Sequence, residues 1–226
     1  MQKRARTLLV WLHVVTSVGW LSQAVALLAL LLHGMSTGDV SAFRMARHLD
    51  HEVLAIMANT SAFSGFMLSA TTPWGYFRHW WVLAKFVITV SQLYVGIFIL
   101  SGNLQAAIEG HLSAWMPVGT SLMIGAIAFQ AWLSVAKPWG RTPWTDPKVK
   151  LPTASAATFV VALVVPVADF AISLWRGNPM PLLMLITVIA YSVRRAARAR
   201  NRSSDASGRG SAARPARRGA AAPGPR

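Results

Sequence analysis

The sequence predicts an all-α protein whose helices cross a membrane several times. Hydrophobic residues make up 54% of the 226 residues and charged residues only 13%, whereas a soluble domain carries about a quarter charged residues. The apolar residues gather in runs long enough to cross the hydrocarbon core as helices. The basic residues gather between and beyond these runs, as expected of a polytopic protein with a fixed orientation.

Six apolar runs are the predicted spans. The first five reach the length that a helix needs to cross the bilayer, and the sixth, with roughly fourteen residues, is shorter than the usual ~17. Arg194 and Arg195 follow the sixth run. Their long side chains can extend toward the membrane surface, which would lengthen this short span. The predicted spans are residues 8–32, 53–70, 80–100, 115–136, 153–174 and 180–193.

The placement of Lys and Arg orients these spans. With the N-terminus in the cytoplasm, eighteen Lys and Arg residues lie in cytoplasmic segments, whereas Arg44, Arg47 and Arg176 lie outside. Such an excess is expected of the cytoplasmic side. Six spans keep both termini in the cytoplasm, whereas five would leave the arginine-rich C-terminus outside. The charge count therefore favours six spans.

The chain divides into three predicted parts. Residues 1–148 form a four-helix core bundle, residues 149–195 add two spans, and residues 196–226 form a cytoplasmic tail rich in Arg, Ala, Gly, Pro and Ser. The tail lacks apolar periodicity, so we expect it to be disordered. Anionic lipid is its expected partner. No specific nucleic acid is expected, because no aromatic residue interleaves the arginines.

Polar residues recur on one face of the third predicted span. Arg78, Trp81, Lys85 and Gln92 are separated by three, four and seven residues, a spacing that aligns them along one side of a helix. Polar groups in a span should face other helices or water, because lipid cannot satisfy them. We therefore predict a bundle with a polar interior. The alternative is that these groups only hold the helices together.

His13 and Lys85 are expected to lie at one depth. The first and third spans run in the same direction, and each residue lies about five residues, or roughly 7–8 Å, from the cytoplasmic boundary. No acidic residue lies at that depth in a predicted span. We predict a site for an anionic ligand formed by His13, Arg78, Trp81, Lys85 and Gln92. The alternative is that Lys85 only reaches to the membrane surface.

Two further features bear on function. Asp169, the one acidic residue inside a predicted span, shares a helical face with Arg176, so we expect a structural ion pair, with a proton relay as the alternative. On the outer side, His48 and His51 lie three residues apart and His111 lies in another outer segment. These histidines predict a copper or zinc site, and the alternative is that they are exposed histidines without a ligand.

Three segments resemble a bacterial family of integral membrane proteins that carries a domain of unknown function. They are LHVVTSVGWLS at 12–22, TTPWGYFRHWWVLAK at 71–85 and LSVAKPWGRTPW at 133–144. The family is distantly similar to the copper-resistance D membrane domain, and the resemblance covers about residues 5–148. It implies a four-helix core, a bacterial inner-membrane location, and motif positions at His13, Arg78, Trp81 and Lys85.

The wider group is also similar to the haem-pathway J type protoporphyrinogen oxidases, which carry a histidine on the first helix and a lysine on a later one. His13 and Lys85 match them in kind and order. The resemblance implies a porphyrin as the anionic ligand, with His13 as axial ligand or base. The chain departs from the pattern at Trp20-Leu21-Ser22, where a glycine is common, and it has no second histidine inside a predicted span.

Two alternative functions follow from the other features. The first is a copper-binding or copper-transporting membrane protein that uses the outer histidines. The second is a non-catalytic membrane scaffold whose basic tail recruits a partner. Haem and copper are the cofactors that these hypotheses imply, and none of the patterns assigns an enzymatic reaction.

Overall fold

The computed structural model describes residues 1–145, 153–177 and 179–212. Helices make up 83% of these residues, and no β-strand occurs among them. The predicted all-α class is confirmed. Met1–Ile189 form one compact unit and Ala190–Arg226 a second. The predicted boundary at residue 148 lies outside the described residues, so the division into three parts stays a prediction.

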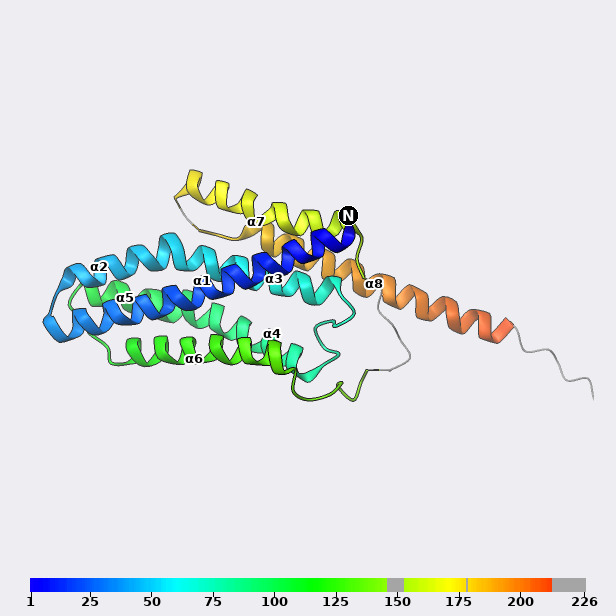
Figure 1. Ribbon diagram of the computed structural model, residues 1–226, viewed down its shortest axis with the longest axis horizontal. Helices are drawn as coiled ribbons and strands as arrows, with labels where there is room; N and C mark the ends of the chain where they lie inside the picture. Colours follow the sequence, from blue (N-terminus) through cyan, green and yellow to red (C-terminus); the bar gives the residue numbers. More distant parts are fainter. Residues whose placement is uncertain (146–152, 178, 213–226) are drawn as a thin grey trace, which may run out of the picture. The chain divides into compact units, whose positions relative to one another are not determined.

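The helices follow the predicted apolar runs and extend beyond most of them. They are α1 (Gln2–Thr37), α2 (Val40–Leu49), η1 (Asp50–Leu54), α3 (Ala55–Thr71), α4 (Trp80–Val95), η2 (Gly96–Leu100), α5 (Ser101–Ile108), α6 (Trp115–Ala136), α7 (Ala156–Arg176) and α8 (Leu182–Ala212). The π-helical turns η1 and η2 do not interrupt the chain direction, so α2, η1 and α3 form one rod, and α4, η2 and α5 form another (Figure 1).

In the described part of the chain, five rods are long and apolar enough to cross a membrane, as expected of a multi-pass membrane protein. They are α1, Val40–Thr71, Trp80–Ile108, α6 and α7. α8 is not among them, because its apolar beginning soon gives way to arginines, and the sixth span stays a prediction. α8 continues to Ala212, so residues 196–212 are helical where disorder was predicted. Ala and Arg favour helix in this segment, and residues 213–226 lie outside the described residues.

Four helices pack in a ring. α1 packs against α3 and α6, and α4 packs against the same two helices from the opposite side. α7 packs against α1 and α3, as Figure 1 also shows. α1 and α4, which carry His13 and Lys85, therefore lie diagonally across the ring. The end of the ring that holds the chain start and the beginning of α4 is called the N-terminal end below, and the other is called the α2–α5 end.

The turn between α1 and α2 is built from local contacts. Gly38 takes a positive φ of 74°, which glycine adopts without strain. The carboxylate of Asp39 then accepts the N–H and the hydroxyl of Ser41, both at 2.8 Å, and these bonds hold the pKa of Asp39 below its usual range. Gly34 leaves room for Phe43, since a Cβ on Gly34 would lie 2.8 Å from the ring.

Asp169 does not pair with Arg176 as the spacing predicted. Its carboxylate is 2% exposed and accepts the N–H groups of Leu183 at 3.1 Å and Met184 at 2.7 Å. Arg176 is exposed at the end of α7 and forms no ion pair with any described residue. The first N–H groups of a helix lack partners within it and form its positive end. Asp169 therefore caps α8 from the neighbouring helix.

Removing this cap should loosen α8. We predict that Asp169→Ala lowers the free energy of unfolding by about 1–2 kcal/mol, because two buried N–H groups lose their acceptor. Arg176→Ala should change it by less than about 0.5 kcal/mol. Unfolding of the purified protein in mild detergent measures both. Equal losses in the two variants would show that the ion pair, and not the cap, stabilises this region.

Candidate functional site

Hydrogen bonds between side chains join α4 to α6. Thr89 donates its hydroxyl to Gln130 Oε1 at 2.7 Å, and Gln130 Nε2 donates to Gln92 Oε1 at 2.6 Å. All three side chains are buried. Toward the N-terminal end, Lys85 Nζ donates to Ser134 Oγ at 2.6 Å. The polar face predicted for the third span thus faces α6 through Lys85, Thr89 and Gln92.

The hydrogen-bonded side chains Lys85, Ser134, Thr89, Gln130 and Gln92 form a polar row between α4 and α6, and Lys85 is its cation. It is half-buried, and its ammonium donates to the neutral hydroxyl of Ser134. No described carboxylate forms an ion pair with it. Taking an ammonium out of water without a counter-charge costs free energy. An anion beside Lys85 would therefore be stabilised.

His13 is held against α3 with its proton position fixed. Nδ1 lies 3.0 Å from the carbonyl oxygen of Ser61 and 3.1 Å from Ser64 Oγ. A carbonyl only accepts hydrogen bonds, so Nδ1 carries a proton and donates it. In the neutral ring, Nε2 then keeps a lone pair, and it forms no hydrogen bond within the described chain. A histidine held in this way is arranged to bind a metal or accept a proton.

A glycine on α3 makes room for the His13 ring. A Cβ added to Gly65 would lie 2.9 Å from His13 Cε1, closer than two carbons approach without movement. His13 and Lys85 lie on helices at opposite sides of the four-helix ring, and no hydrogen bond joins them among the described residues. Their proximity stays a prediction.

Arg78 and Trp81 lie at the N-terminal end, beside this row. α4 begins at Trp80, so Arg78 lies in the preceding loop and not on the helical face that its spacing predicted. Its carbonyl oxygen accepts the N–H of Thr142 at 3.1 Å. Trp81 packs edge-on against Trp74, with ring centroids 5.2 Å apart. Arg78 belongs to the loop before α4 and Trp81 to the first turn of α4, whereas Gln92 is buried between α4 and α6.

Several residues of the site were not predicted. Ser134 lies one helical turn from Gln130, and this spacing was the signal that would have found it. Ser61 and Ser64 lie among small residues of α3, where a packing role is the simpler interpretation. Trp20 lies seven residues after His13 on the same face of α1, and its buried indole Nε1 has no hydrogen-bond acceptor among the described residues.

The outer histidines are not gathered into a metal centre in the described part of the chain. No group of three or more His, Cys, Asp or Glu residues there could hold a metal ion. His48 lies near the end of α2, and His111 follows α5. His51 Nε2 lies 3.4 Å from the carbonyl oxygen of Gly177. A site with fewer protein ligands stays a prediction.

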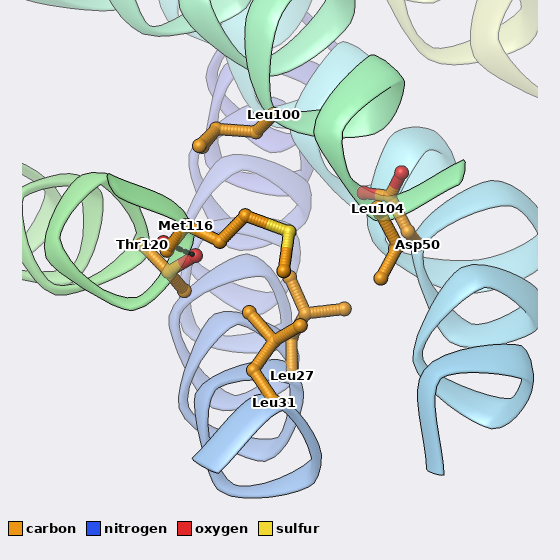
Figure 2. A pocket seen from close by; sticks show the side chains of 7 residues that line it. All are labelled: Leu27, Leu31, Asp50, Leu100, Leu104, Met116 and Thr120. Carbon is orange, nitrogen blue, oxygen red and sulfur yellow. Dashed lines mark hydrogen bonds between the residues drawn. The ribbon is translucent and has the colours of Figure 1, made fainter. Parts of the chain in front are cut away.

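A small cavity lies at the α2–α5 end, far along α1 from His13. Figure 2 shows mainly leucine side chains around it, with Asp50 on one wall and Thr120 on another. Asp50 Oδ2 accepts the hydroxyl of Ser101 at 2.8 Å, which links η1 to the start of α5. The cavity volume is about 10 Å³, room for about one water molecule. It is too small for a porphyrin.

Comparison of the chain with protein-family models, with curated proteins and with solved structures found no match.

The bonds of Gln130 provide a test of the α4–α6 contact. We predict that Gln130→Leu lowers the free energy of unfolding by about 1–2 kcal/mol, because it leaves Thr89 and Gln92 buried without their partner. Ser121→Ala, on the exposed side of α6, should change it by less than about 0.5 kcal/mol. Unfolding in detergent measures both variants. A Gln130→Leu protein as stable as Ser121→Ala would contradict the assigned contact.

Proposed function

We propose that the protein binds an anionic ligand inside the membrane, near the inner leaflet, between α1 and α4. Lys85 supplies the positive charge that holds the anion, and His13 Nε2 supplies an axial ligand or a base. The observation that carries this proposal is the half-buried ammonium of Lys85, whose hydrogen bond goes to a neutral hydroxyl within an apolar helix.

Electrostatics make this a binding site rather than only a helix contact. Two opposite charges 4 Å apart attract by about 4 kcal/mol at an effective dielectric constant of 20. A hydrogen bond from a charged group contributes about 1.5–3 kcal/mol net. The ammonium of Lys85 has three donors, so it can hold an anion and keep its hydrogen bond to Ser134. Arg78, at the same end of the ring, adds positive charge along the approach.

A porphyrin is the ligand class that we propose. Its carboxylates suit Lys85, and the fixed lone pair of His13 Nε2 suits a central metal, because metal-bound histidines commonly donate their other N–H to a carbonyl. The indole N–H of Trp20, buried without an acceptor, offers a donor further along α1. Neither described cavity lies between His13 and Lys85, so binding of a porphyrin requires α1 and α4 to separate at the N-terminal end.

The proposed topology places this site on the cytoplasmic side. We propose six spans with both termini in the cytoplasm of a bacterial cell, in its inner membrane, with the apolar beginning of α8 as the sixth span. The arginine-rich segment after it then faces the anionic leaflet. In this orientation the ligand enters from the cytoplasm or from the inner leaflet.

Absorption spectroscopy tests the ligand class. The protein, produced with ample haem and purified in mild detergent, should show a Soret band. We predict that His13→Ala loses or shifts the band and that Lys85→Met weakens haem binding by about tenfold or more. Lys137→Met, which removes an exposed cation at the same end, should retain the band. Wild-type protein without a Soret band would exclude haem, and unchanged binding by Lys85→Met would exclude Lys85 as the anchor.

Gly65 provides a test of His13 that leaves the histidine in place. We predict that Gly65→Ala displaces the imidazole and alters the haem spectrum, because the new Cβ would overlap His13 Cε1. Gly125→Ala is the control, because a Cβ at Gly125 would meet no atom within 4 Å. A spectrum of Gly65→Ala identical to that of Gly125→Ala would show that His13 does not bind the metal.

A further inference from the structure

Two loops meet at the N-terminal end of the ring (Figure 1). The first, residues 72–79, joins α3 to α4, and the second, residues 137–145, follows α6. They are called the paired loops below. The hydroxyl of Thr142 and the indole N–H of Trp144 both donate to the carbonyl oxygen of Phe77, at 2.6 and 2.8 Å. These bonds join the two loops into one structured surface.

His79 and Arg141 lie opposite each other in this pairing. They form an antiparallel bridge whose two hydrogen bonds come from the flanking residues. The side chains of such a pair lie close together on the same face of the two segments. The guanidinium of Arg141 therefore has an imidazole as its cross-strand neighbour and not a carboxylate. Arg141 is exposed and forms no ion pair with any described residue.

The paired loops carry positive charge and no acidic residue. Lys137 and Arg141 are cations of the second loop, and neither loop contains Asp or Glu. Lys137 Nζ lies 5.4 Å from the centroid of the Trp74 ring, a distance at which a cation and an aromatic ring attract each other. The surface therefore suits an anion, and the planar guanidinium of Arg141 matches the oxygen atoms of a phosphate.

The paired loops also lie where three of the spanning rods end. Val40–Thr71 ends before the first loop, Trp80–Ile108 begins after it, and Trp115–Ala136 ends before the second. In either orientation of the protein, such a position is the boundary between the hydrocarbon core and the lipid headgroups. Tryptophan is enriched at this boundary because its ring is amphipathic. The exposed tryptophans of this surface are Trp74, Trp80, Trp139 and Trp144.

One of these tryptophans is held in a strained backbone conformation. Trp139 has a φ of 64°, which a residue with a bulky side chain rarely adopts. Such a conformation costs free energy, and strained residues gather at binding sites. Trp139 is 56% exposed, so burial within the protein does not offset this cost. The conformation points to a contact outside the chain.

We propose that the paired loops bind an anionic phospholipid. Arg141 holds its phosphate, and the rings of Trp139 and Trp144 pack against its glycerol and the first carbons of its chains. A soluble phosphate ester would pair with Arg141 but would leave the tryptophans without an apolar partner, whereas a phospholipid satisfies both. The lipid is held here by residues other than the arginines of α8, and independently of the ligand at Lys85.

Native mass spectrometry of the full-length protein in non-ionic detergent tests the lipid site. Phosphatidylglycerol and phosphatidylcholine with the same acyl chains differ in net charge, so their binding isolates the role of the anion. We predict that phosphatidylglycerol binds the wild type about tenfold more tightly and that Arg141→Gln loses most of this preference. Arg44→Gln, which removes an exposed arginine from α2, is the matched control and should keep it. Lys85→Met should also keep it, which separates this lipid from the ligand proposed above.

Trp139→Gly is a second variant, which relieves backbone strain. Glycine adopts a φ of 64° readily, so the Tm should stay the same or rise. Binding of phosphatidylglycerol should nevertheless weaken by about threefold, because the ring that packs against the lipid is gone. A residue with only a structural role would not combine these two effects.

Equal binding of the two lipids to the wild type would overturn the site, as would equal losses of preference in Arg141→Gln and Arg44→Gln. If Arg141→Gln does not fold, Trp139→Gly decides, and wild-type affinity for phosphatidylglycerol in that variant would overturn the site. Glycerol phosphate that displaces the lipid at equal concentration would assign the surface to a soluble phosphate instead. An acidic protein that binds the wild type but not Arg141→Gln, without any lipid preference, would assign it to a protein contact.

Discussion

The requirement that polar groups in an apolar helix find partners inside the protein governs how these helices meet. Lys85, Thr89 and Gln92 lie on one face of α4, and lipid offers none of them a hydrogen bond. α6 supplies Ser134 and Gln130 on the facing side. This row decides which face of α4 points inward. It also holds the ammonium of Lys85 on the side of α4 that faces α6.

The same requirement acts at the ends of helices. The N–H groups of Leu183 and Met184 near the start of α8 meet a carboxylate from α7, so they are bonded within the protein. The charged groups of Asp169 and Lys85 differ in the hydrogen bonds that the protein offers them. Asp169 satisfies its bonds within the protein and is buried, whereas Lys85 makes one hydrogen bond to a neutral group. That asymmetry is why the anion site is proposed at Lys85.

Much of the fold followed from residue patterns, because helix length and the burial of polar faces depend on local sequence. The apolar runs predicted five of the spanning rods, and the spacing of Lys85 and Gln92 predicted an inward face. Local periodicity could not predict contacts between distant segments. The cap that Asp169 provides to α8 depends on where a later helix begins, and the same face also accommodated an ion pair with Arg176. Arg78 fitted the helical spacing, but Pro73 and Gly75 precede it. The loop before α4 also pairs with the loop after α6, through a bridge between His79 and Arg141, so α4 begins only at Trp80.

The central claim is that Lys85 holds an anion in the membrane. Native mass spectrometry of the protein released from gentle detergent tests this claim without assuming which anion is bound. The account predicts a bound anionic species on the wild-type protein that is retained by Lys137→Met and lost from Lys85→Met. An identical set of bound species on Lys85→Met and wild type would contradict it.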